Sequence, residues 1–299
     1  SISLIVNQNG CADTTQSSIQ VNPIPNSTFT IAASACAGSP VQIAYTGTAT
    51  IAANYTWNFA GGTVHSGSGQ GPYSVSWPSA GNTSVSLNVT ENGCTSAPNN
   101  ISILINAIPN ASFNTGQFTC PNDQHTVTFS GTAGAGAIYS WTFGGANIIS
   151  GSGAGPYVIS WNNSGSKTIG LILTDNGCAD TSSFNVTVKT IPTSIFSLPP
   201  EACPLDTVQV MYTGNAAPSA TYNWSFAGAT VISGSGTGPY SLSWPAATSA
   251  NITLSVTENG CTSPQSQNSI VIAALPAVDA GIDLSMCSGA ILTIGSAPA

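Results

Sequence analysis

The chain has 299 residues but few charges: two lysines, no arginine and ten acids give a net charge of −8. Two lysines are too few to form a basic patch, so we expect no binding to nucleic acid or to an anionic membrane surface. No stretch of 18 apolar residues occurs, which predicts no membrane insertion, and 41% hydrophobic residues in regular alternation argue against intrinsic disorder.

The first residues have the pattern of two paired strands. Ile2, Leu4 and Val6 alternate with other residues and precede an Asn-Gly-Cys sequence. Alternation of period two predicts a half-buried strand, and Asn-Gly between two such runs predicts a tight hairpin turn. The Asn-Gly-Cys pattern occurs four times, ending at Cys11, Cys94, Cys178 and Cys261. We therefore expect residues 1–23 to form the last two strands of a preceding repeat.

A short proline-containing segment follows each hairpin pattern. These joints begin at Pro23, Ala107, Thr190 and Ala274. Proline has no main-chain donor for a sheet, so one sheet should end at each joint and the next begin. The boundaries predict complete repeats over 24–107, 108–190 and 191–274, and the N-terminal part of a following repeat over 275–299. Joints this short favour a stiff row of domains over a flexible tether.

The first half of each repeat is predicted to contain two strands. Phe29 lies on the first strand, and Val41, Ile43 and Tyr45 alternate on the second. His125 occupies the position of Val41 in the second repeat. A functional histidine is one interpretation, but no second ligand or base recurs beside His125 or His65. We therefore favour a structural role for both.

Two tryptophans recur in each repeat. The first lies in a Tyr-x-Trp-x-Phe pattern, which places three aromatic side chains on one face of a strand. The second follows a Ser-Gly-Ser-Gly-x-Gly-Pro-Tyr segment, which recurs every 83 or 84 residues and predicts a turn before a half-buried strand. Large aromatic side chains favour the centre of a sandwich core, and a carbohydrate-stacking platform is the alternative. The predicted core tryptophans are Trp57, Trp77, Trp141, Trp161, Trp224 and Trp244.

Short strands separated by turn signals, with no helical period, predict an all-β chain. The expected architecture is a tandem array of Ig-like β-sandwich domains. The order of the motifs Cys-x-Gly-x-x-Val, Tyr-x-Trp-x-Phe, Gly-x-Gly-Pro-Tyr-x-x-x-Trp and Asn-Gly-Cys resembles the PKD-like and gliding-adhesin-type repeats of very large secreted surface proteins of Bacteroidota. This resemblance covers the whole chain.

The resemblance implies a particular export route and location. Such proteins are exported by the type IX secretion system and serve as surface adhesins, filaments or cell-wall-anchored stalks. Bacteria of this group O-glycosylate Asp-Ser/Thr-aliphatic motifs. Asp13-Thr14-Thr15 and Asp206-Thr207-Val208 resemble that motif, which implies Thr14 and Thr207 as candidate glycosylation sites.

The eight cysteines are evenly spaced, with steps of 25 or 26 alternating with steps of 58. An even number of cysteines at regular spacing predicts disulfides, and disulfides indicate an oxidising, extracellular location. Pairing within a repeat would join Cys36 to Cys94. In an Ig-like sandwich, however, these positions lie at opposite ends of a strand of roughly 26 Å, whereas a disulfide needs Cα atoms within about 7 Å. We therefore expect bonds between neighbouring repeats, Cys36–Cys178 and Cys120–Cys261.

The remaining cysteines are expected to bond outside these repeats. Cys11 and Cys94 would pair with upstream sequence, and Cys203 and Cys287 with downstream sequence. The two partial repeats at the ends of the chain could in principle combine between copies by strand exchange. The composite repeat would lack the counterpart of residues 49–83. We therefore expect the chain to be a segment of a longer tandem polypeptide.

No recurring set of titratable residues suggests catalysis, so we expect a non-enzymatic protein without a cofactor or metal site. The sequence favours a structural region of a long extracellular bacterial surface protein, forming a stiff disulfide-linked fibre, filament or stalk. The expected partners are neighbouring repeats, other chains of the same fibre and surface glycans. The alternative is an adhesin that binds glycans or proteins through loops that differ between repeats, such as 133–137 and 216–220.

Overall fold

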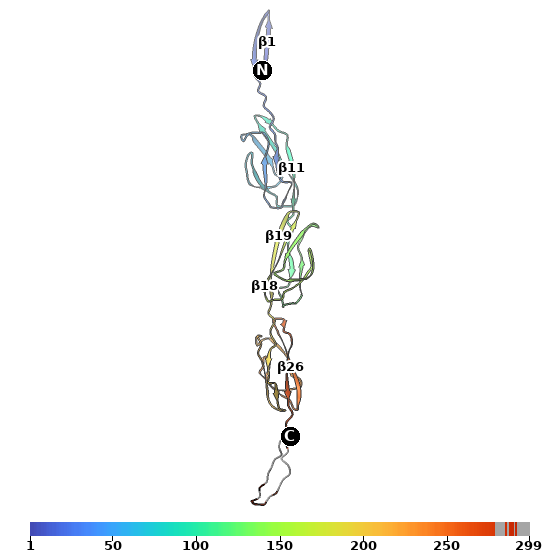
Figure 1. Ribbon diagram of the computed structural model, residues 1–299. Coiled ribbons are helices and arrows are strands. Elements are labelled where there is room, and N and C mark those ends of the chain that lie inside the picture. The colour runs from blue at the N-terminus through green and yellow to red at the C-terminus, as the bar shows by residue number, and fades with distance from the viewer. Residues whose placement is uncertain (279–284, 286, 290, 292–299) are drawn as a thin grey trace.

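The computed structural model describes residues 1–278, 285, 287–289 and 291. Three β-sandwiches lie end to end below an N-terminal hairpin, and they form one elongated row (Figure 1). In the part of the chain that the structure describes, every regular element is a β-strand. The expected partial repeat over 275–299 lies largely outside the described residues.

The hairpin at the N-terminus consists of β1 (Ile2–Gln8) and β2 (Cys11–Ser17). The two strands pair antiparallel, from Ile2 opposite Ser17 to Gln8 opposite Cys11. Asn9 and Gly10 both have positive φ, which is the backbone conformation of a type I′ turn. Every residue of both strands is exposed.

Repeat 1 contains nine strands, repeat 2 eight and repeat 3 nine. In repeat 1 they are β3 (Phe29–Thr30), β4 (Ser34–Cys36), β5 (Val41–Tyr45), β6 (Asn54–Asn58), β7 (Thr63–Ser66), β8 (Tyr73–Ser76), β9 (Gly81–Glu91), β10 (Cys94–Thr95) and β11 (Asn99–Asn106). In repeat 2 they are β12 (Phe113–Thr115), β13 (Phe118–Thr119), β14 (His125–Phe129), β15 (Ile138–Thr142), β16 (Asn147–Ser150), β17 (Tyr157–Ser160), β18 (Gly165–Asp175) and β19 (Cys178–Val188). In repeat 3 they are β20 (Phe196–Ser197), β21 (Glu201–Ala202), β22 (Val208–Tyr212), β23 (Thr221–Ser225), β24 (Thr230–Ser233), β25 (Tyr240–Ser243), β26 (Thr248–Glu258), β27 (Cys261–Thr262) and β28 (Ser266–Ile272).

Each repeat is a sandwich of two sheets with the same strand order. In repeat 1 the first sheet has the order β3-β5-β8-β7, and the second places β9 between β6 and β11, with β4 outside β11. Repeats 2 and 3 reproduce both sheets. This is the two-layer topology of an Ig-like sandwich.

The first strand of each repeat is divided between the two sheets. In repeat 1, β3 pairs antiparallel with β5, and the chain then crosses to the other sheet, where β4 pairs parallel with β11. Asn106 therefore lies opposite Cys36. The crossing carries Cys36 to the end of the repeat from which the chain leaves, which positions it beside the next repeat.

The centre of each core comes from the long strand that precedes the Asn-Gly turn. Val85, Leu87 and Val89 of β9 are fully buried, and Val75 and Ile43 pack with them from the opposite sheet. Their alternation with more exposed residues is the pattern of a strand with one face in the core.

One expectation about the repeated Tyr-x-x-x-Trp strand is wrong. The repeat pattern predicts a half-buried strand here, but Ser74 and Ser76 of β8, which alternate with its large side chains, are only 8% and 6% exposed. β8 is a central strand between β5 and β7. Side chains as small as serine are covered by the larger residues of neighbouring strands, and His65 contacts Ser76 with 2.8 Å between Nε2 and Oγ.

Candidate functional site

The joints between repeats are the places where sequence-predicted residues from two domains meet. A disulfide joins Cys36 of repeat 1 to Cys178 of repeat 2, with 5.6 Å between their Cα atoms. A second joins Cys120 of repeat 2 to Cys261 of repeat 3, with a Cα separation of 5.7 Å. These are the same two pairs that we expected from the sequence.

Two local features bring each pair of cysteines together. The first is the end of a short strand: Cys36 closes β4, and Cys120 directly follows β13. The second is the tight Asn-Gly turn of the next repeat, where Asn176 and Gly177 have φ of 47° and 79°. Because Cys178 directly follows this turn, the turn presents its side chain towards the preceding repeat. Cys178 and Cys261 are each 1% exposed.

A side-chain hydrogen bond accompanies the disulfide at each joint. The Asn106 Nδ2 amide donates to the main-chain oxygen of Asn176 at 3.0 Å. At the next joint, Lys189 Nζ donates to the main-chain oxygen of Asn259 at 2.7 Å. Before repeat 1, Asn22 Nδ2 donates to the main-chain oxygen of Asn92 at 3.1 Å. Each donor and acceptor are 70 residues apart, so the contact repeats with the array.

The second joint contains one of the two lysines of the chain. Lys189 Nζ lies 4.5 Å from the centre of the Phe118 ring, in a cation–π contact that adds to its hydrogen bond. Both residues line a shallow cleft of about 300 Å³, together with Asp123 and the Asn259-Gly260 turn. The cleft lies between two repeats. Most of the residues that line it already contact one another to form the joint.

These side-chain donors were not predicted from the sequence. The signal was present, because Asn22, Asn106 and Lys189 occupy equivalent positions just before each joint. It was not interpretable from the sequence alone, because asparagine and lysine share only the ability to donate a hydrogen bond. A related contact was also missed, in which a carboxylate accepts from a main-chain N–H group of a loop.

The carboxylates that make this contact end the long central strands. Glu91 accepts from the Thr50 main-chain N–H at 2.9 Å, Asp175 from Gly134 at 2.7 Å, and Glu258 from Ala217 at 2.9 Å. Hydrogen bonds from the Thr50 hydroxyl and N–H groups lower the pKa of Glu91, because they stabilise its ionised form. The acids therefore hold a loop in each repeat and are not a shared catalytic cluster.

Three of the other cysteines occupy positions equivalent to the bonded ones, because Cys11 and Cys94 follow an Asn-Gly turn and Cys203 directly follows β21. Cys94 Sγ lies 3.5 Å from the main-chain oxygen of Asn22, at the entrance to repeat 1. Cys11, Cys203 and Cys287 are exposed. Their expected bonds to upstream and downstream sequence stay predictions.

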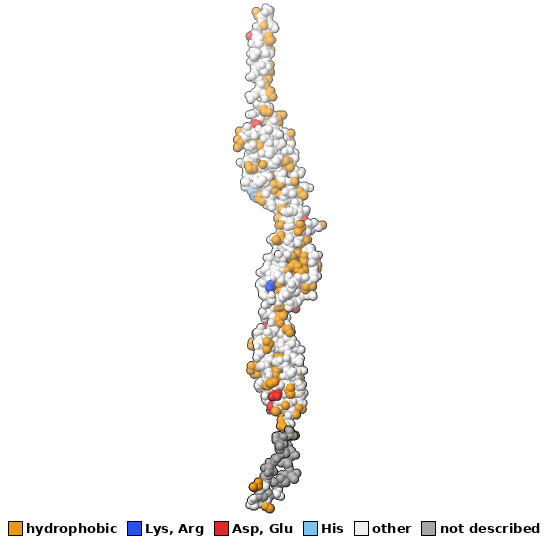
Figure 2. Space-filling view, in the orientation of Figure 1, with side chains coloured by type: hydrophobic (Ala, Val, Ile, Leu, Met, Phe, Trp, Pro, Cys, Tyr) orange, Lys and Arg blue, Asp and Glu red, His pale blue; other side chains and the backbone are white. Residues whose placement is uncertain are grey.

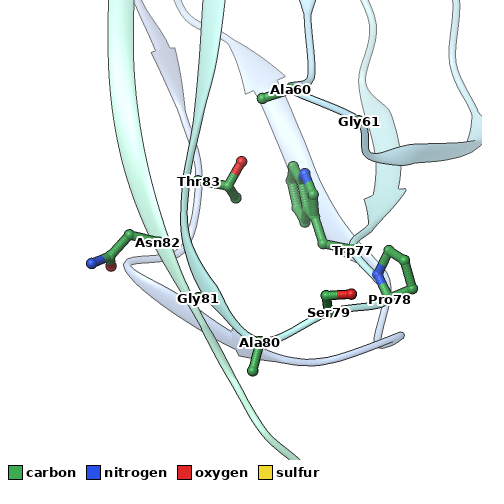
Figure 3. A pocket seen from close by; sticks show the side chains of 9 residues that line it. All are labelled: Ala60, Gly61, Trp77, Pro78, Ser79, Ala80, Gly81, Asn82 and Thr83. Carbon is green, nitrogen blue, oxygen red and sulfur yellow. The ribbon is translucent and has the colours of Figure 1, made fainter.

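The second tryptophan of each repeat is buried at the end of the core. Trp77, Trp161 and Trp244 are 4%, 1% and 2% exposed. The indole N–H groups of Trp77 and Trp161 donate to the main-chain oxygens of Phe59 and Phe143, each at 2.9 Å. Beside Trp77 lies an open pocket of about 310 Å³, lined by the two loops around Ala60 and Ala80 (Figure 3). No titratable side chain lines this pocket.

The first tryptophan of each repeat is half-buried and covered on one edge. Trp57 packs edge-to-face on Phe29 and parallel to Phe59, and its indole N–H donates to the Gly69 main-chain oxygen at 3.0 Å. Trp141 and Trp224 make the equivalent contacts to Gly153 and Gly236. The glycine-rich turn thus covers each indole N–H, so the geometry favours packing over carbohydrate stacking.

The histidines and the candidate glycosylation sites lie in different surroundings. His125 is 6% exposed, its Nε2 lies 2.7 Å from Thr115 Oγ1, and its ring packs against Trp161. Burial lowers the pKa of His125 because it disfavours the charged ring. Thr14 and Thr207 are exposed, which makes both accessible to a modifying enzyme.

Neither a metal-binding cluster nor a membrane-spanning helix is found in the described residues. Within them, no group of three or more His, Cys, Asp or Glu side chains is close enough to hold a metal ion. No helix in the same residues is long and apolar enough to cross a membrane.

One protein-family model matches part of the chain. Residues 189–272 match the family model of the PKD-like domain. No curated protein matches the chain. Similar solved structures include the N-terminal eight Ig domains of Down Syndrome Cell Adhesion Molecule, at 10% identity and a TM-score of 0.49, covering 91% of this chain and 39% of that one. The titin I-band fragment I67–I69 has 10% identity and a TM-score of 0.45, covering 85% of this chain and all of the fragment.

A bacterial protein is also among the similar structures. Invasin, an integrin-binding protein, has 12% identity and a TM-score of 0.38, and the match covers 90% of this chain and 64% of invasin. The fold assignment comes from the sheet topology and the family match. The chain carries tandem Ig-like β-sandwich repeats joined by disulfides, and the third of them matches the PKD-like domain.

Proposed function

We propose that this chain is a structural repeat region of a long extracellular bacterial surface protein, and that its disulfide-linked joints make a stiff stalk or filament. The observation that carries the proposal is the repetition of one joint. Both joints combine a disulfide with a side-chain hydrogen bond to the Asn-Gly turn. Each joint therefore has two covalent connections, the short main-chain linker and the disulfide. Two connections resist bending of one repeat against the next better than one.

The surface of the chain supports a structural role. Charged side chains are sparse along the visible face (Figure 2). Among the described residues, no repeat carries a group of three or more His, Cys, Asp or Glu side chains close enough to hold a metal ion. The disulfides favour an oxidising location outside the cytoplasm. Export through the type IX system in a member of the Bacteroidota is part of the same proposal, and it is motivated by the sequence motifs.

Small-angle X-ray scattering of the whole chain tests the stiffness. We expect the oxidised protein to scatter as a rod, and the Cys36→Ser/Cys178→Ser variant to have a shorter maximum dimension because joint 1 bends. Equal dimensions for both proteins would contradict the proposed role of the disulfide. Electron microscopy of cells that produce the full-length protein should show uniform fibres that are absent when its gene is deleted.

The alternative function is adhesion through loops that differ between repeats. The loop over 133–136 is exposed, and its sequence differs from that of its counterpart in repeat 1. Binding of the isolated chain to a glycan array, lost when residues 133–136 are replaced by the repeat 3 sequence, would favour this alternative. If the chain has only a structural role, we expect no binding to the glycan array.

Lateral association of chains is a further part of the proposal. The edge strands β7, β16 and β24 are exposed along their whole length and contain no Lys, Arg, Asp or Glu. Unprotected strand edges can pair with another chain. Concentration-dependent light scattering should detect this association, and Val231→Lys on β24 should weaken it.

A further inference from the structure

The disulfides connect unlike strands of neighbouring repeats. Cys36 ends the first strand of repeat 1, and Cys178 begins the last strand of repeat 2. Cys120, which follows β13, and Cys261, which begins the short strand β27 just before the last strand β28, make the equivalent connection between repeats 2 and 3. Each bond therefore provides a covalent route that enters one repeat on its first strand and leaves the next repeat on its last strand.

Two continuous covalent paths follow from this connectivity. Path one runs through residues 24–36, across the Cys36–Cys178 bond, and on through 178–203. Path two runs through residues 94–120, across the Cys120–Cys261 bond, and on through 261–274. Within each repeat, one path contributes the first strand and the other contributes the last strand.

The two paths lie side by side inside every repeat. The first and last strands pair parallel, as β4 with β11, β13 with β19 and β21 with β28. Main-chain hydrogen bonds join them, including Leu104 N–H to Ala33 O at 3.0 Å and Lys189 N–H to Thr119 O at 2.9 Å. The remaining strands of each repeat lie in segments 37–93, 121–177 and 204–260, which connect one path to the other.

We propose that the disulfides carry tension around the body of each repeat, so that pulling along one path does not unfold the sandwiches that it crosses. This inference deepens the proposed stalk function and rests on it for its biological meaning. The mechanical behaviour depends only on the connectivity described above.

Path one has little slack. Its strands β3, β4 and β19 are already extended, and residues 37–177 lie outside it. A strand rises roughly 3.3 Å per residue, and a fully stretched chain reaches roughly 3.6 Å per residue, so a strand can lengthen by only about a tenth. Opening repeat 1 without the disulfide would instead free a segment of roughly 80 residues, and would lengthen the chain by roughly 250–300 Å.

Single-molecule force spectroscopy on the full chain tests this directly. Handles are attached through azide-bearing residues at the exposed positions Gln20 and Thr190, so that the pull follows path one. For the oxidised protein we expect no lengthening step of roughly 250–300 Å. The Cys36→Ser/Cys178→Ser variant should show such steps.

The second disulfide supplies a matched control. Cys120→Ser/Cys261→Ser removes a bond that is not on path one, so this variant should behave like the oxidised wild type. If the first variant does not fold, reduction of an already tethered wild-type molecule should produce the same steps.

Unfolding steps of this size in a tether whose Cys36–Cys178 bond has been verified by mass spectrometry would overturn the inference. Their absence after reduction would overturn it as well. The proposed stiffness is judged separately by scattering. If the oxidised protein scatters as a rod but shows these steps, the stalk proposal stands. The inference that the disulfides carry tension around each repeat is then wrong.

Discussion

Asn106, at the end of repeat 1, donates its side-chain amide to the main-chain oxygen of Asn176 in repeat 2, at 3.0 Å. The acceptor belongs to the turn that also presents Cys178 to Cys36. One short turn thus receives both a hydrogen bond and a covalent bond from the preceding repeat. Lys189 and Asn259 reproduce this relationship at the next joint.

Removing the Asn106 side chain should loosen the first joint without unfolding either repeat. A single exposed hydrogen bond contributes about 0.5–1.5 kcal/mol, so Asn106→Ala should lower the unfolding temperature of repeats 1 and 2 by roughly 10 °C at most and leave both folded. We expect faster amide hydrogen exchange at Gly177 and Cys178. Asn106→Lys, which mimics Lys189, is the matched control and should keep the slow exchange. Equal exchange in all three proteins would contradict a role for this contact.

Disulfide mapping should recover Cys36 bonded to Cys178 and Cys120 bonded to Cys261. Trypsin is poorly suited to this experiment because the chain has only two lysines and no arginine, so pepsin or chymotrypsin is preferable. Recovery of Cys36 bonded to Cys94 would contradict both the structure and the proposed paths. Loss of one bond should lower the free energy of unfolding by about 2–4 kcal/mol.

His125 should make the stability of repeat 2 depend on pH. Burial beside Trp161 lowers its pKa in the folded state, whereas the unfolded chain retains a pKa of about 6.5. As the pH falls below about 6.5, the unfolded state binds more protons than the folded state, so repeat 2 loses stability. Thermal unfolding at several pH values measures this loss.

The equivalent positions in the other repeats provide the control for His125. Val41 and Val208 occupy them and do not titrate. His125→Val should therefore reduce the loss of stability between pH 7.5 and pH 5. An unchanged pH dependence in this variant would assign the effect to other groups.

The two tryptophans of repeat 2 should differ in their contribution to stability. Trp161 is 1% exposed and donates a hydrogen bond to Phe143, so Trp161→Ala should cost about 3–5 kcal/mol in chemical denaturation. Trp141 is half-buried, and Trp141→Ala should cost less. If Trp141→Ala removed glycan binding and left stability unchanged, the carbohydrate-platform alternative would be supported over packing.

The repeat pattern made much of the architecture predictable from the sequence. Asn-Gly turns, alternating strands and joint prolines are local signals, and their recurrence predicted the strand order along the chain. The arrangement of cysteines across the joints then followed from the ends at which the loops of a sandwich lie. The match of residues 189–272 to the PKD-like domain agrees with this prediction for the third repeat.

The features that the sequence did not predict depend on contacts between distant residues. Ser74 and Ser76 look like solvent-facing residues, but their burial depends on strands that lie beside β8 only in the folded sheet. The loop contact of Glu91 spans 41 residues and uses a main-chain N–H group, which carries no residue-specific signal. Such contacts are visible only once the strands have been paired.

The distance along the chain between bonded cysteines also constrains how the protein matures. Cys36 and Cys178 are 142 residues apart, so a nascent chain exposes the first thiol well before its partner has been synthesised. Oxidation at each joint must wait for the following domain to fold its hairpin. The Cys36–Cys178 bond can therefore form only after repeat 2 has been made and folded, so covalent closure of this joint comes later than the folding of repeat 1.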